Sequence, residues 1–283
     1  MYLTRRNLLK GLLAAVASSA RAVRADVDPT PLLFGTTPVF LDEQVEFLAR
    51  WSSYLETVLR RPVRFVQRGR YRDILALLLE RKLDSAWICG YPYVRMRDQL
   101  RLLAVPVYAG RPFYRAYLIV PADDTSTQSI LDLRAQVFAY SDPDSNSGWL
   151  VPQVELKRAG EDPNRFFRKT FYTWGHRKVI EAVAAGLAHG GAVDGYVWES
   201  MARRYPGLTA ATRVAWRSQE YGFPPVVVHQ DAVGMEKLQQ ALVGMTSTPT
   251  GRNLLARLNL DSFAFGDEEL YSGIEANSRY LNA

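Results

Sequence analysis

Residues 141–152 form a polar segment with three serines and two aspartates, which we name the serine loop. It consists of Ser141-Asp142-Pro143-Asp144-Ser145-Asn146-Ser147-Gly148-Trp149-Leu150-Val151-Pro152. The apolar run Val137–Tyr140 before it predicts a strand, and the residues after Ser147 predict a helix. The hydroxyl groups of Ser145 and Ser147, together with backbone N–H groups freed at a helix start, form a donor set that suits an oxyanion. The same residue types also favour an ordinary helix N-cap, so this loop alone leaves capping open.

Short apolar runs alternate with amphipathic segments on both sides of this loop, which predicts an α/β fold with mainly parallel sheets. In the first part of the chain, strands are predicted at Leu32–Gly35, Val63–Val66, Ser85–Ile88 and Leu102–Val107, with helices at Leu41–Leu59 and Tyr71–Arg81. In the second part, strands are predicted at Val137–Tyr140, Lys169–Thr173, Ala192–Val197 and Arg213–Trp216, with helices after Ser147, His176 and Glu199. Three last helices are predicted at Met235–Met245, Gly251–Leu258 and Glu268–Leu281.

Two apolar segments, Tyr114–Val120 and Pro224–His229, separate these groups of elements. We expect them to be hinge crossings between two lobes, with residues 26–120 and 225–283 in lobe 1 and residues 121–224 in lobe 2. Two crossings between α/β lobes create a central cleft. In open α/β sheets, ligands bind beyond the carboxyl ends of the strands, so the site is expected in strand-to-helix loops.

The first 25 residues have the pattern of a cleaved export signal, with a basic start, an apolar middle and small residues before Asp26. Arg5-Arg6 resembles the twin-arginine motif, which predicts export in the folded state to the periplasm. The alternative is a membrane anchor, but about 10 apolar residues are fewer than the roughly 20 that span a bilayer. This segment holds five basic residues and no acid, so the net charge of +6 falls to nearly zero in the remaining chain.

A nearly neutral folded part, without runs of Lys and Arg among aromatics, argues against nucleic acid as a partner. The single cysteine, Cys89, excludes an internal disulfide. The three histidines are scattered without the paired spacing of zinc sites, so neither a metal nor another cofactor is expected.

A second strand-to-helix loop, Trp174-Gly175-His176, could bring a histidine donor to the same anion. An alternative from another class is a hydrolase that uses Ser145 with His176. No Gly-x-Ser-x-Gly elbow or orienting acid accompanies that pair, which favours a binding protein over an enzyme.

The sequence also resembles a known protein family. Residues 32–283 are similar to the PhnD-like, phosphonate-binding subgroup of type II periplasmic binding proteins. The resemblance is carried by Lys82–Trp87, by the serine loop, by Gly175-His176 with Glu181–Val183, and by Ala192–Asp194. It implies a two-lobed clamp that captures phosphate, phosphite or a phosphonate for a membrane ABC permease.

The resemblance also implies the ligand-binding residues. The anion donors of the family fall on Ser145, Asn146, Ser147 and His176, and its two cleft tyrosines fall on Tyr71 and Tyr114. An acid of the family maps to Glu199 with a spacing shifted by about two residues. Without the resemblance, each tyrosine could equally be a half-buried aromatic residue with a satisfied hydroxyl.

The chain departs from the family at two positions. Members that bind aminoalkylphosphonates carry an acid before the return crossing, where this chain has Gly222-Phe223-Pro224-Pro225. An unpaired ammonium there would be costly to desolvate, which favours a ligand without an amine. Cys89 stands close to a position where the family carries a tyrosine, and it is either a small buried hydrophobe or a ligand. A thiol suits As(III), so the alternative function is an arsenite sensor that signals to a membrane histidine kinase.

Overall fold

The computed structural model describes residues 30–38 and 45–283 of the chain. The proposed export signal and the beginning of the helix predicted from Leu41 lie outside the described residues, so the export route stays a prediction. Within the described ranges, no helix is both long enough and apolar enough to cross a membrane.

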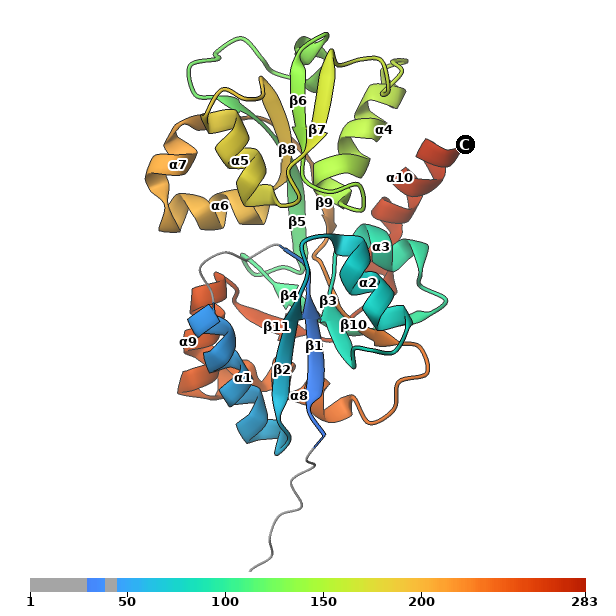
Figure 1. Cartoon of the computed structure of the whole chain (residues 1–283), viewed down its shortest axis with the longest axis vertical. Helices are drawn as coiled ribbons and strands as arrows, with labels where there is room; N and C mark the ends of the chain where they lie inside the picture. The colour runs from blue at the N-terminus through green and yellow to red at the C-terminus, as the bar shows by residue number, and fades with distance from the viewer. Residues whose placement is uncertain (1–29, 39–44) are drawn as a thin grey trace, which may run out of the picture.

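The molecule consists of two α/β units stacked along its long axis, as the sequence predicts (Figure 1). We call the unit built on the six-stranded sheet lobe 1 and the unit built on the five-stranded sheet lobe 2. The strands of lobe 1 are β1 (Leu32–Thr36), β2 (Val63–Gln67), β3 (Ser85–Trp87), β4 (Leu100–Val107), β10 (Val226–His229) and β11 (Ser262–Ala264). The strands of lobe 2 are β5 (Phe113–Pro121), β6 (Val137–Tyr140), β7 (Lys169–Tyr172), β8 (Gly190–Asp194) and β9 (Thr212–Gly222).

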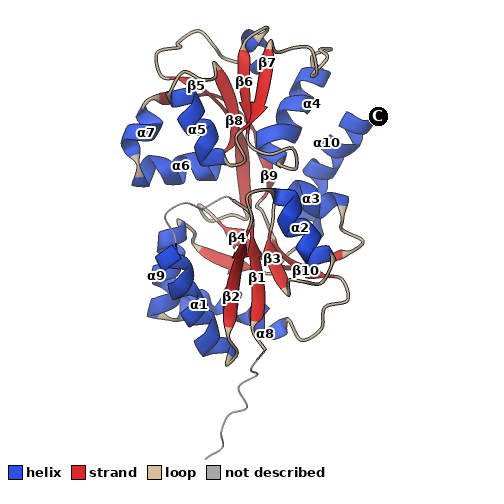
Figure 2. Cartoon of the chain, viewed as in Figure 1, coloured by secondary structure: helices blue, strands red, loops and turns tan. Residues whose placement is uncertain are grey.

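Helices flank both sheets, as Figure 2 shows with helices in blue and strands in red. The helices that accompany the first sheet are α1 (Val45–Leu59), α2 (Tyr71–Leu79), α3 (Gly90–Arg95), α8 (Glu236–Val243) and α9 (Pro249–Leu258). Those that accompany the second are α4 (Val151–Arg158), α5 (His176–Ala184), α6 (Gly195–Arg204) and α7 (Pro206–Ala210). The chain ends with α10 (Ser272–Asn282).

The expectation of mainly parallel sheets needs correction, because both sheets are mixed. The strand orders are β11-β4-β10-β3-β1-β2 and β7-β6-β8-β5-β9. In the first sheet, β10 lies antiparallel between β3 and β4. In the second, β5 is antiparallel to both β8 and β9. In each sheet the strands that precede α2, α3, α4, α5 and α6 direct their loops toward the other lobe (Figure 1).

The return between the lobes also differs from the prediction. The antiparallel pair of β5 and β9 runs from the second sheet toward lobe 1, and Phe113 lies opposite Gly222 at its end (Figure 1). The predicted strand Arg213–Trp216 is therefore much longer, and Val226–His229 already belongs to the sheet of lobe 1. The crossing is made by the end of β9 and residues 223–225.

The predicted boundary between a strand and the next helix is wrong. The sequence predicts a strand that extends to Val197 and a helix that begins after Glu199. Strand β8 ends at Asp194, and helix α6 begins at Gly195. The Asp194 carboxylate caps the helix by accepting hydrogen bonds from the backbone N–H groups of Tyr196 (2.9 Å) and Val197 (3.4 Å). Tyr196 and Val197 form the buried face of a helix, and a short apolar run does not distinguish that from a strand.

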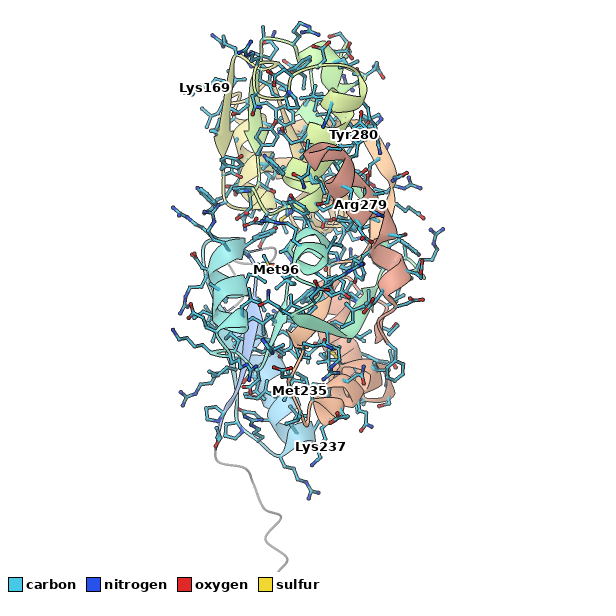
Figure 3. All side chains as sticks on the ribbon, turned by 90° about the vertical axis from the view of Figure 1, so that its right-hand side faces the viewer. Met96, Lys169, Met235, Lys237, Arg279 and Tyr280 are labelled. Atoms are coloured by element: carbon cyan, nitrogen blue, oxygen red, sulfur yellow. The ribbon has the colours of Figure 1, made fainter. Side chains whose placement is uncertain are left out.

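Helix α10 contacts both lobes. On lobe 2, the Lys157 ammonium donates hydrogen bonds to the backbone oxygens of Tyr280 (3.0 Å) and Leu281 (3.1 Å), at the helix end that favours a cation. On lobe 1, Arg97 pairs with Glu275 at 3.1 Å. Figure 3, viewed from this side, shows Tyr280 beside lobe 2. The C-terminal helix therefore links the lobes in addition to the two crossings.

Candidate functional site

The serine loop begins a short π-helical turn, Asn146–Leu150, that leads into α4. The Ser145 hydroxyl accepts a hydrogen bond from the Gly148 backbone N–H at 3.0 Å, so the capping function expected as an alternative is present. Asn146 and Ser147 are at most 1% exposed. π-helical turns of this kind are frequent at functional sites.

Capping does not account for the whole loop. The oxygens Ser141 Oγ, Asn146 Oδ1 and Ser147 Oγ are buried and make no hydrogen bond of good geometry in the part of the chain that the structure describes, although the Ser147 side chain lies near the Tyr114 hydroxyl. Leaving a buried polar group unpaired costs about 1–3 kcal/mol, so three in one loop are unusual unless they serve another purpose. A bound oxyanion that carries a proton would supply the missing partners, because its oxygens can accept from the two serine hydroxyls and its O–H group can donate to Asn146 Oδ1.

Residues of lobe 1 and of the crossing meet this loop directly. The Asn146 backbone N–H donates to the Cys89 sulfur at 3.3 Å, and the Asn146 amide donates to the Tyr114 hydroxyl at 2.9 Å. The Tyr71 backbone N–H donates to the Asp142 carboxylate at 3.1 Å. These contacts join the beginning of α2, the end of β3 and the first crossing to the serine loop.

His176, at the beginning of α5, completes the cluster. Its Nδ1 accepts a hydrogen bond from the Asp194 backbone N–H at 3.1 Å, and its Nε2 lies 3.2 Å from the Tyr71 hydroxyl. Burial lowers the pKa of His176 to about 3, so the ring is neutral and its one proton is on Nε2. Nε2–H then donates to the Tyr71 oxygen, and the Tyr71 hydroxyl also lies near the Ser145 side chain, so its proton is directed toward the serine loop.

The donors of this cluster are neutral groups. Burial raises the pKa of Cys89 to about 12, so the thiol is protonated at neutral pH. Burial, with the nearby Cys89 second, raises the pKa of Tyr114 well above its ordinary value. Neutral hydroxyl, amide and imidazole donors can bind an anion without a fixed cation, provided that several of them are aimed at it.

The structure brings together seven of the eight residues proposed from the sequence: Tyr71, Cys89, Tyr114, Ser145, Asn146, Ser147 and His176. It does not bring Glu199 to them. Glu199 lies on the second turn of α6, where its carboxylate accepts hydrogen bonds from the hydroxyls of Tyr108 and Tyr117. The acids that contact the cluster are instead Asp142 and Asp194.

Asp142 and Asp194 were not among the proposed site residues. Asp142 lies two residues after the end of β6, and Asp194 is the last residue of β8. An acid at a strand end before a helix start was the signal that could have identified both. Asp194 is fully buried, and burial raises its pKa to about 7.

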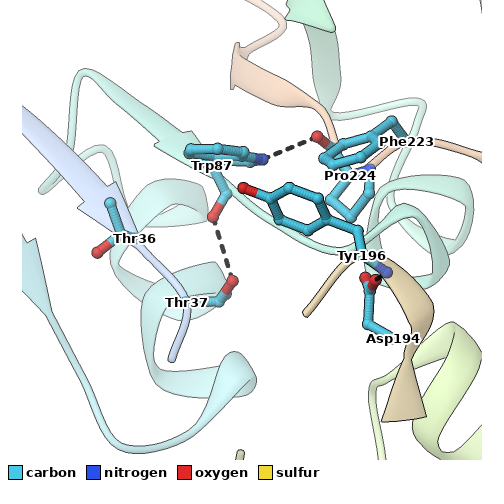
Figure 4. A pocket seen from close by; sticks show the side chains of 7 residues that line it. All are labelled: Thr36, Thr37, Trp87, Asp194, Tyr196, Phe223 and Pro224. Carbon is cyan, nitrogen blue, oxygen red and sulfur yellow. Dashed lines mark hydrogen bonds between the residues drawn. The ribbon is translucent and has the colours of Figure 1, made fainter. Parts of the chain in front are cut away.

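A small cavity lies next to the cluster between the lobes (Figure 4). It is lined by Thr36, Thr37, Trp87, Asp194, Tyr196, Phe223 and Pro224. The Trp87 indole donates to the Pro224 oxygen at 2.8 Å, and the Thr37 hydroxyl donates to the Trp87 oxygen at 3.3 Å. Its volume of about 10 Å³ accommodates a single water molecule, so the two lobes are tightly packed against each other at these residues.

No group of three or more His, Cys, Asp or Glu side chains in residues 30–38 and 45–283 is arranged to hold a metal ion.

Two serines of the loop allow a matched test of binding against capping. We expect Ser147→Ala to weaken the binding of methylphosphonate or phosphite by about 1–3 kcal/mol, the range for a lost bond to a charged or buried group. The melting temperature of the ligand-free protein should stay the same or rise, because the variant removes an unpaired buried hydroxyl.

The control is Ser145→Ala, which removes the N-cap and should lower stability by about 0.5–2 kcal/mol. Calorimetric titration and thermal unfolding of both variants measure the two effects. A loss of stability without a loss of affinity in Ser147→Ala would mean that Ser147 serves only the fold.

Comparisons with known proteins place the chain in a family. The family model described as "ABC transporter, phosphonate, periplasmic substrate-binding protein" matches residues 34–271. A probable ABC transporter phosphite binding protein, PhnD1 of Prochlorococcus marinus (strain MIT 9301), is 25% identical over 157 residues. That alignment covers 51% of this chain and 52% of the relative, so the match spans about half of each protein.

Solved structures share the fold. A binding protein component of an ABC phosphonate transporter from Pseudomonas aeruginosa has a TM-score of 0.83 at 20% identity, over 90% of this chain and 87% of that one. PhnD1 from Prochlorococcus marinus (MIT 9301), in complex with methylphosphonate, has a TM-score of 0.80 at 21% identity, over 90% and 99% of the two chains. These likenesses confirm the two-lobed type II periplasmic binding protein fold. The relatives are substrate-binding proteins of ABC transporters rather than enzymes. The chain therefore belongs to the family of periplasmic phosphonate substrate-binding proteins of ABC transporters.

Proposed function

We propose that this protein captures a small phosphorus oxyanion, namely phosphate, phosphite or a small phosphonate, and delivers it to a membrane ABC permease. The observation that carries the proposal is the set of unpaired buried oxygens on the serine loop, at the point where Tyr71 of lobe 1 and Tyr114 of the first crossing meet this loop and His176. The oxygens of one anion can accept from the hydroxyls of Ser147 and Tyr71. An oxyanion that carries a proton can also donate to Asn146 Oδ1.

Contacts from both lobes explain how capture works. Tyr71 belongs to lobe 1, whereas Ser147 and His176 belong to lobe 2, so a ligand in the cluster touches both. Such a ligand stabilises the closed arrangement by its differential affinity for it, which is the mechanism of hinge closure. A permease that distinguishes closed from open lobes would then receive only the loaded protein.

The return crossing supports a ligand without an amine. Phe223 and Pro224, which line the small cavity between the lobes, offer no carboxylate to an ammonium group. Asp194 lines the same cavity, but its carboxyl group already caps α6 and burial raises its pKa to about 7, so it is a poor partner for a desolvated ammonium group.

A thermal-shift panel tests the proposed function. We expect phosphate, phosphite or methylphosphonate to raise the melting temperature, with a gain of about 2.7 kcal/mol in stability at a concentration 100-fold above Kd. Sulfate and arsenite complete the panel. A flat response to every phosphorus oxyanion would contradict the proposal.

The arsenite sensor is the alternative, and Cys89 decides between the two ligands. The sulfur accepts a hydrogen bond from the Asn146 backbone, and burial keeps the thiol protonated, whereas As(III) bonds to thiolate. We therefore expect Cys89→Ser to keep phosphite binding within about threefold, since the serine oxygen can accept the same N–H.

Calorimetric titrations of the wild type and of Cys89→Ser with arsenite and with phosphite provide the measurement. The proposal predicts a saturable heat of binding with phosphite in both proteins and no heat of binding with arsenite in either. Arsenite heat in the wild type alone, without phosphite heat, would establish the sensor function instead.

A further inference from the structure

A cation–π contact joins the two lobes beside the anion cluster. The Arg70 guanidinium carbon lies 4.6 Å from the centroid of the Trp174 indole ring. Arg70 is the last residue before α2 of lobe 1, and Trp174 lies between β7 and α5 of lobe 2. Arg70 is exposed and Trp174 is half-buried, so the contact lies at the solvent edge of the interface between the lobes.

The two residues of this contact lie close to Tyr71 and His176 of the cluster in the sequence. Arg70 directly precedes Tyr71, and Trp174 stands two residues before His176, whose Nε2 lies 3.2 Å from the Tyr71 hydroxyl. Separation of the lobes must therefore break the Arg70–Trp174 contact together with the Tyr71–His176 hydrogen bond. Neither Arg70 nor Trp174 belongs to the donor set itself.

The backbone of Trp174 supports a specific purpose for its side chain. Its φ angle is +62°, in the left-handed region that a bulky residue rarely adopts. Such a conformation costs free energy and persists only where the surrounding structure compensates for it. Here it presents the indole ring to Arg70, while Gly175 packs close to the Pro38 oxygen of lobe 1, at 3.4 Å from the position of an added Cβ.

We infer that Arg70 and Trp174 form a closure latch, a pair of positioning residues that holds the lobes together around the ligand and slows its release. The inference rests on the proposed function, because it assigns a kinetic role within the same site. A cation–π contact at an exposed edge changes an equilibrium constant by a factor of about 2 to 5. Since the contact exists only between closed lobes, the change falls on the dissociation rate.

The chain offers a matched control for the charge of Arg70. Arg68 is also exposed, lies two residues before Arg70 and donates a hydrogen bond to the Gln67 backbone oxygen, and no ring contact of its guanidinium is found in the described part of the chain. Arg70→Gln and Arg68→Gln both remove one positive charge near the cleft, which slows the association of an anion in each case. Only Arg70→Gln removes the latch.

The test is stopped-flow measurement of methylphosphonate and phosphite binding by the full chain, with Arg70→Gln, Trp174→Leu, the double variant and Arg68→Gln. We expect dissociation to be about 2- to 5-fold faster in both single latch variants, no faster again in the double variant, and unchanged in Arg68→Gln. Equal dissociation rates in all five proteins, or additive effects in the double variant, would overturn the latch.

Small-angle X-ray scattering of the same proteins separates this inference from the proposed function. For the ligand-free proteins, the latch predicts a larger radius of gyration for Arg70→Gln and Trp174→Leu than for Arg68→Gln. If the wild type binds neither methylphosphonate nor phosphite, the proposed function fails, and scattering alone decides on the latch. Identical radii in that case would reject it.

Discussion

Replacement of Gly148 by alanine should abolish high-affinity oxyanion binding and should also destabilise the fold. A Cβ atom at this position would lie 1.8 Å from Ser141 Oγ and 2.7 Å from Ser141 Cβ, closer than atoms can approach. Ser141 and Ser145 are both fully buried, so the serine loop must shift to accommodate the methyl group. Overpacking of this kind costs about 1–3 kcal/mol of stability.

The loss of affinity in Gly148→Ala should be larger than the loss of stability suggests. A shift of the loop displaces Ser147 and Asn146 together, and two lost bonds to an anion correspond to a weakening on the order of 100-fold or more. Gly207→Ala is the control, because nothing lies within 4 Å of a Cβ added there. Titration calorimetry and urea unfolding compare the variants. Wild-type affinity in Gly148→Ala would show that the loop geometry does not determine binding.

The buried pair of Asp194 and His176 should give the protein a stability that changes little between pH 4 and 6.5. Burial raises the pKa of Asp194 from 3.8 to about 7, so its contribution is present below pH 4 and is lost as the pH rises toward 7. Burial lowers the pKa of His176 from 6.5 to about 3, so its contribution is present above pH 6.5 and is lost as the pH falls toward 3. Each effect alone is on the order of 4 kcal/mol, and over the shared range the two oppose each other.

Single substitutions should separate these opposing contributions. Relative to the wild type, Asp194→Asn should gain stability as the pH rises from 4 to 7, and asparagine retains the helix cap. Relative to the wild type, His176→Gln should lose stability as the pH rises from 3 to 6.5. Urea unfolding at half-unit pH steps measures both differences. If both differences were independent of pH, the two groups would not be held in the protonation states described here.

The sequence predicts the local elements of this protein well where one pattern dominates. Strand Val137–Tyr140 is observed with the predicted bounds, because an apolar run is followed by a loop rich in Ser, Asp and Gly. The structure also places the donor residues of the serine loop and His176 in one cluster, as their positions in two strand-to-helix loops and the resemblance to a family predict. Their position at strand ends follows from the α/β pattern.

The rest depends on contacts between distant parts of the chain. The hydrogen bond of Asn146 to Tyr114 and that of Tyr71 to His176 span 32 and 105 residues, and no periodicity encodes them. A hydrogen bond also explains why Asp194 contacts the cluster instead of the predicted Glu199. A capping hydrogen bond, rather than apolar spacing, determines where α6 begins, and that one boundary decides which acid faces the cleft.

A crystal structure of the protein with methylphosphonate would test the proposed oxyanion site most directly. We expect one ligand between the lobes, with phosphonate oxygens within hydrogen-bond distance of Ser147 Oγ and the Tyr71 hydroxyl. His176 Nδ1 should still accept from the Asp194 backbone. A ligand bound elsewhere, with the oxygens of the serine loop still unpaired, would contradict the proposed site.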